Sequence, residues 1–111
     1  MHCIEIIPET SISACTGALE WFLMEYLSDH GLDLTVEHKD LSDEGVTGWC
    51  LKTGEGEFTI QIHQDLTGDE YTKTLLHEMY HVYQYLNGMP QCEMCAYMSE
   101  DQNLDKLVNH Q

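Results

Sequence analysis

Two histidines and a glutamate lie close together in the segment HEMYH, residues 77–81. Residues four positions apart on an α-helix project from the same face, so His77 and His81 can present two imidazoles to one metal ion. Glu78 lies about 100° around the helix from His77, close enough to reach a metal-bound water without being a ligand itself. This spacing indicates a zinc hydrolase, in which zinc lowers the pKa of water and polarises a carbonyl while the carboxylate moves the proton.

A zinc site of this kind takes a third ligand from the protein. The candidates in the sequence are Glu93, Glu100, His63, Cys92 and Cys95. A turn at NGMP, residues 87–90, would return the following helix towards the histidine pair and put Glu93 about one turn into it. Glu100 comes about two turns later and fits less directly. The C-x-x-C pair at 92 and 95 is interpreted chiefly as packed thiols, because a structural zinc usually takes four ligands and the sequence has no second pair; metal binding and a redox pair are the alternatives.

The motif lies inside a predicted helix that covers residues 67–88. The segment Thr67–Glu70 reads T-x-x-E, which is a capping box with acids in the first turn, and Asn-Gly at 87–88 ends the helix. Apolar side chains recur at helical spacing on another arc than His77 and His81, so the histidines are expected to border a cleft. Pro90 can occupy the first turn of a further helix over residues 92–98.

The elements before this helix alternate in the way that half-buried strands do. Strands are predicted at 3–7, 32–38, 46–52 and 57–64, and a helix with a broad apolar stripe is predicted within 11–31. Short turns between the last three strands predict an antiparallel meander. The expected fold is a single α+β domain over residues 1–111. It has a small, mostly antiparallel twisted sheet, a packing helix, the active-site helix and a following Glu-bearing helix.

The segments LLHEMYHVYQYLNG and EMCAYMSE resemble a short-chain gluzincin. They are similar to the ImmA/IrrE-type metallopeptidases and to the small SprT-like zincins that phages often encode. In that family H-E-x-x-H is followed by a helix whose first Glu is the third zinc ligand and which reads roughly E-x-x-A-x-x-x-A or E-x-E-A-Y. The segment Glu93–Tyr97 matches this pattern, except that Cys95 stands where a second Glu is common. The resemblance covers about a third of the chain, from Thr67 to Glu100.

The resemblance implies a minimal zincin with one Zn²⁺ per chain, held by His77, His81 and Glu93, with Glu78 as the general base. In zincins the strand before the active helix usually pairs with the substrate, so by analogy residues 59–63 would bind a peptide by strand addition. His63 would then line the cleft and stabilise an oxyanion. Tyr97 is a further candidate for that role, and so is Tyr85.

The charge balance excludes some partners. The chain has 20 Asp and Glu against four Lys and no Arg, and a net charge of −16. Such a chain repels phosphate backbones, so neither nucleic acid nor an anionic membrane is an expected partner. The N-terminus lacks the basic start and apolar run of a signal peptide, and five irregularly spaced cysteines do not suit a secreted disulfide scaffold. A cytoplasmic location is expected, and the likeness to small zincins adds phages and viruses as sources.

The expected function is zinc-dependent hydrolysis of peptide bonds, as limited or regulatory proteolysis of a protein substrate. So short a chain has little room for elaborate substrate pockets, so selectivity would come from an edge strand or a partner protein. The alternative is a non-catalytic metal-binding or protein-interaction module on the same fold.

Overall fold

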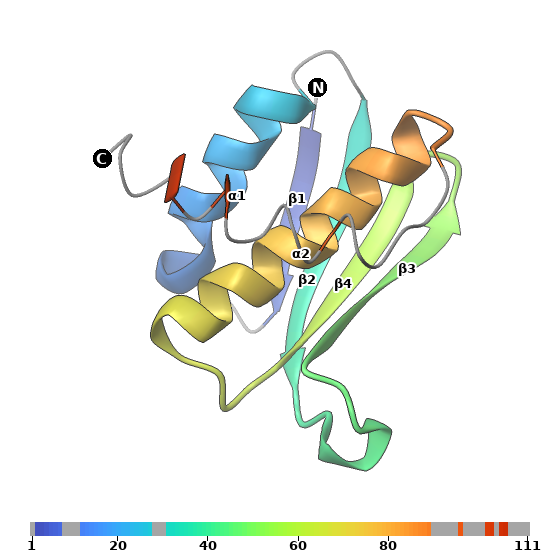
Figure 1. The fold of residues 1–111 in the computed structure, drawn as a ribbon. Coiled ribbons are helices and arrows are strands. Elements are labelled where there is room, and N and C mark those ends of the chain that lie inside the picture. The colour runs from blue at the N-terminus through green and yellow to red at the C-terminus, as the bar shows by residue number, and fades with distance from the viewer. Residues whose placement is uncertain are drawn as a thin grey trace.

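The computed structural model describes residues 2–7, 12–27, 31–89, 96, 102, 103, 105 and 106 (Figure 1). The elements are β1 (His2–Ile7), α1 (Ile12–Tyr26), β2 (Leu32–Lys39), the 3₁₀ turn η2 (Ser42–Glu44), β3 (Gly48–Gly54), β4 (Glu57–His63) and α2 (Gly68–Leu86). A four-stranded sheet carries both helices, which confirms the expected α+β class. Within the described residues, neither helix is long and apolar enough to cross a membrane.

The strand order is β1-β2-β4-β3, and it corrects the expected meander. β1 pairs with β2 and β2 pairs with β4 in parallel, while β3 pairs with β4 in antiparallel orientation. The sheet is therefore mixed, and the prediction of mostly antiparallel pairing was wrong. Figure 1 shows β3 at one side of the sheet and β1 at the other.

Burial explains why β4 rather than β3 lies beside β2. The apolar side chains of β2 and β4 alternate with polar ones and are buried, whereas none of the β3 side chains is fully buried. The two central places in a sheet suit the strands that can bury one face completely. The chain leaves β2, forms β3, and returns through the turn at Glu55 and Gly56, so β4 runs in the same direction as β2.

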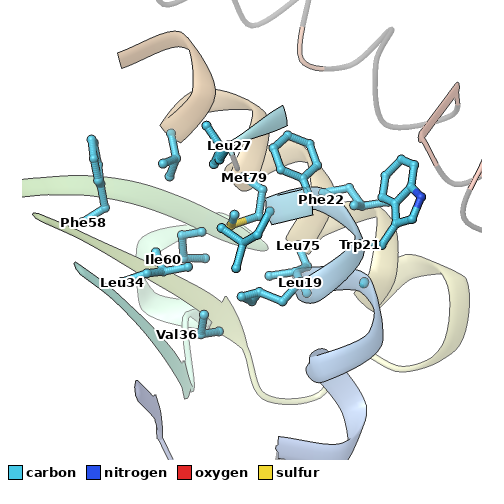
Figure 2. Close-up of a cluster of buried hydrophobic side chains, with 14 of the residues drawn as sticks. Leu19, Trp21, Phe22, Leu27, Leu34, Val36, Phe58, Ile60, Leu75 and Met79 are labelled. Carbon is cyan, nitrogen blue, oxygen red and sulfur yellow. The ribbon is translucent and has the colours of Figure 1, made fainter. Parts of the chain in front are cut away.

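The core lies between the sheet and the two helices, which cover the same face (Figures 1 and 2). β2 and β4 contribute Leu34, Val36 and Ile60, and the helices contribute side chains such as Phe22 and Met79, all almost fully buried. Trp21 of α1 packs edge-on against Phe22. This packing fixes α2 across the sheet and decides which of its residues can face β3.

The N-terminus of α2 has no side-chain cap, whereas its C-terminus is capped by backbone hydrogen bonds. Thr67 is the N-cap residue, but its side chain makes no capping hydrogen bond, so the predicted capping box is not formed. At the C-terminus, Gly88 adopts a left-handed φ of 65°, the Gly88 N–H donates to the Tyr85 carbonyl, and the Met89 N–H donates to the Gln84 carbonyl. This pair of bonds is a Schellman motif, and it ends the helix at the Asn-Gly predicted to end it.

Candidate metal centre

His77, Glu78 and His81 lie in the middle of α2, and each side chain is buried, with 6% exposure. The rings of His77 and His81 lie with their centroids 5.0 Å apart and their planes at 75°. One helical turn separates the two histidines, which explains why the rings meet on the same face. The structure therefore brings together the two imidazoles that the motif predicted.

The ring of His81 makes a hydrogen bond to a second side chain of α2. Its Nδ1 lies 2.9 Å from Oε1 of Gln84, one turn later on α2. An amide oxygen only accepts hydrogen bonds, so Nδ1 must carry the proton, and in the neutral ring Nε2 then keeps the lone pair. A neutral imidazole with one nitrogen hydrogen-bonded and the other able to coordinate is the form that binds zinc, so the donor set fits this metal.

Glu78 lies against the first residues of β3. A Cβ atom built on Gly48 would come 3.6 Å from Cγ of Glu78 and 2.8 Å from Cγ2 of Thr74. Cys50 is two residues further along β3, so its side chain projects from the same face of the sheet as that Cβ. Burial raises the pKa of the Cys50 thiol well above its ordinary value, and the nearby Glu78 carboxylate raises it further. The predicted general base therefore lies where α2 borders β3.

The third metal ligand predicted from the sequence falls outside the residues that the structure describes. Glu93 and Tyr97 lie outside the described residues, as do the alternatives Glu100, Cys92 and Cys95. Between them, Ala96 is helical and fully buried. In the ranges that the structure describes, no three His, Cys, Asp or Glu side chains gather into a metal site. The assignment of Glu93 stays a prediction.

His63 lies at the end of β4, where its ring contacts polar groups of the neighbouring turns. Its Nδ1 accepts a hydrogen bond of 3.0 Å from the Leu41 N–H, and its Nε2 lies 3.5 Å from the Asp65 carboxylate. Asp40 is 3.9 Å from the ring on the Nδ1 side. In the neutral ring the Nε2 proton is thus directed at an acid, and the predicted oxyanion role of His63 stays untested.

The strand predicted to bind a peptide is not at an edge. β4, which carries residues 59–63, lies between β2 and β3 and pairs with both, so its backbone groups are already used in the sheet. Among the described strands, β1 and β3 are the edges, and β3 is the one that borders Glu78. Residues 59–63 therefore have no free edge in the sheet, and the prediction of strand addition at these residues was wrong.

Three residues at the site were not expected from the sequence: Gln84, Gly48 and Cys50. Gln84 follows His81 by three positions, a spacing at which helical side chains meet, so this contact had a readable signal. Gly48 and Cys50 had none, because their closeness to α2 depends on the strand order.

Comparison with known proteins gives no relative for this chain. No protein-family model matches it, no curated protein matches it, and no solved structure matches its fold.

Proposed function

We propose that this chain is a zinc-dependent metallopeptidase that cleaves peptide bonds in a protein substrate. The observation that carries the proposal is the buried pair His77 and His81, with Glu78 between them in sequence and β3 beside it. Two potential zinc ligands and a potential general base are thus held together in one turn of a helix and shielded from bulk solvent, which is the arrangement that H-E-x-x-H hydrolysis uses.

In this proposal His77, His81 and Glu93 hold one Zn²⁺. Zinc, when bound, supplies a Lewis acid that polarises the scissile carbonyl and acidifies water. The carboxylate of Glu78 takes a proton from the attacking water and delivers it to the leaving amine. Because Glu78 is buried on α2, few solvent molecules can take this proton from its carboxylate, and the proton stays within the site.

We further propose that the substrate binds as an extended strand along β3. Its outer edge is unused within the described sheet, and the strand brings a bound backbone next to Glu78. The excess of acidic over basic residues favours a substrate segment of basic or neutral character. A free thiol at Cys50 fits a reducing compartment such as the cytoplasm.

Three full-length variants test the proposal by zinc content and by cleavage of a fluorescence-quenched peptide library. We expect about one zinc per chain in the wild type and in Glu78→Gln, and no stable zinc in His77→Ala. Cleavage should fall by about 10²–10⁴-fold in Glu78→Gln. His110→Gln, which changes a histidine outside the motif, is the matched control and should resemble the wild type.

Two outcomes would count against the enzyme. A wild-type chain that holds no zinc and unfolds at the same temperature with and without a chelator has no metal centre. A chain that holds zinc in the wild type and in Glu78→Gln, but cleaves nothing in either, is the non-catalytic module on the same fold.

A further inference from the structure

Gln84 is a buried polar residue whose position needs a physical reason. It lies in the last full turn of α2, and only 1% of its surface is exposed. A primary amide without hydrogen-bond partners in such a place would destabilise the fold. Leu or Met would fill the same space without needing hydrogen-bond partners, so what distinguishes Gln84 from an apolar side chain here is the hydrogen bonding of its amide.

Its Oε1 accepts the hydrogen bond from Nδ1 of His81 at 2.9 Å. A neutral imidazole has one proton, which can be on either nitrogen, and the hydrogen bond made by one nitrogen decides the state of the other. With an acceptor at Nδ1, the proton is held there and Nε2 becomes the coordinating nitrogen. With the acceptor removed, both tautomers become accessible, and one of them blocks Nε2.

The backbone around Gln84 is also fixed. The Gln84 carbonyl accepts the Met89 N–H at 2.8 Å, and Asn87 donates from its backbone N–H and from its Nδ2 to the Tyr83 carbonyl. These bonds keep the final turn of α2 from fraying, which the last turn of a helix otherwise does. The amide is therefore attached to a rigid part of the helix and held at a fixed distance from His81.

We propose that Gln84 is the positioning residue of the metal centre: it holds the Nδ1 proton of His81 and so presents Nε2 to the metal. The effect of Gln84 on zinc binding rests on the proposed function. Its effect on the tautomer of His81 applies to the metal-free chain as well. Gln84 would contact neither metal nor substrate, and would act only through His81.

The test compares Gln84→Met, which keeps the size but removes the acceptor, with Gln84→Glu, which restores an acceptor oxygen. ¹⁵N NMR of the metal-free chain reports the protonated nitrogen of His81, and competition with a chromophoric chelator reports Zn²⁺ affinity. We expect the Nδ1–H tautomer in the wild type and in Gln84→Glu, and its partial loss in Gln84→Met. Zinc affinity should fall by about 10–100-fold in Gln84→Met and be largely recovered in Gln84→Glu.

Gln64→Met is the matched control, since Gln64 is exposed, and it should change neither reading. The proposal is overturned if the metal-free wild type carries the His81 proton on Nε2, or if Gln84→Met binds zinc as tightly as the wild type. The wild-type spectrum decides the tautomer even if Gln84→Met fails to fold. Failure of the proposed function looks different: zinc affinity would follow the Gln84 series while no variant, including the wild type, cleaves peptide.

Discussion

At the scale of single residues, Cys50 shows how the surroundings of Glu78 control chemistry. The thiol is largely desolvated between β3 and α2, and this burial, followed by the Glu78 carboxylate, raises its pKa. A thiol that keeps its proton is a poor nucleophile and a poor metal ligand. Cys50 is therefore interpreted as a small apolar packing residue beside the proposed base, and not as a reactive group.

The raised pKa makes a prediction about stability in alkali. The ordinary thiol pKa is 9.0, so above that pH the unfolded chain loses a proton that the folded chain keeps. Because the unfolded state then binds fewer protons, the unfolding free energy should fall as pH rises, by at most about 1.4 kcal/mol per pH unit. Urea unfolding at about pH 8 and about pH 10 measures this fall.

Cys50→Ala is the control, since it keeps every other titrating group of the chain. Its unfolding free energy should decline less between the two pH values than that of the wild type. Equal declines in the two proteins would mean that Cys50 ionises normally in the folded state.

The residues of the site could be predicted from the sequence only where their chemistry is local. His77, Glu78 and His81 share one helix, so helical geometry alone brings the two rings together. Gln84 lies on the same helix and could have been found by the same reasoning. Cys50 could not, because its distance from Glu78 depends on which strand α2 crosses.

At the scale of elements, Gly48 sets how closely β3 approaches α2. A Cβ at this position would come 2.8 Å from Cγ2 of Thr74 and 3.1 Å from the Gln61 carbonyl oxygen. Real side chains do not tolerate the first distance, so in Gly48→Ala the Thr74 side chain must rotate or α2 and β3 must move apart. We expect it to destabilise the fold by about 1–3 kcal/mol, measured by urea unfolding, and to lower peptide cleavage by displacing Glu78.

Two further variants separate this close approach from the general effect of losing a glycine. Gly31→Ala has open space around the new methyl group and no left-handed backbone, so it should be close to neutral. Adding Thr74→Ser to Gly48→Ala removes the closest contact and should restore part of the stability. A Gly48→Ala protein as stable as Gly31→Ala would show that β3 and α2 are not in tight contact.

The elements themselves were largely predictable, but their neighbours in the sheet were not. Alternation placed β2 at Leu32–Lys39 and β4 at Glu57–His63 almost at the predicted bounds, because each strand buries every second side chain. The pairing of β2 with β4 depends on competition between strands for the centre of the sheet. Turn lengths favoured β3 as the neighbour of β2, and burial of apolar area favoured β4.

At the scale of the whole molecule, the net charge of −16 should weaken the fold through self-repulsion. The sheet register also creates a local repulsion, because the exposed acids Asp33 of β2 and Glu57 of β4 are direct cross-strand partners. We expect the unfolding temperature of the metal-free chain to rise by about 4–8 °C, or about 1 kcal/mol, between ~10 mM and ~500 mM NaCl. Differential scanning calorimetry measures this rise.

Glu57→Gln is the matched variant, because it removes one charge from the Asp33 pair and keeps the size of the side chain. It should unfold at a higher temperature than the wild type in low salt and gain less from added salt. An unfolding temperature that does not depend on salt would show that the acidic groups are too well separated to repel.

The position of β3 at the edge of the sheet has a consequence for how cleavage sites would be chosen. A peptide paired with β3 turns alternate side chains to opposite faces, and a shift by one residue turns every side chain over. Only shifts by two residues, about 7 Å, preserve the match between the peptide and the face that Glu78 borders. Bonds cut within one substrate segment would therefore be separated by an even number of residues.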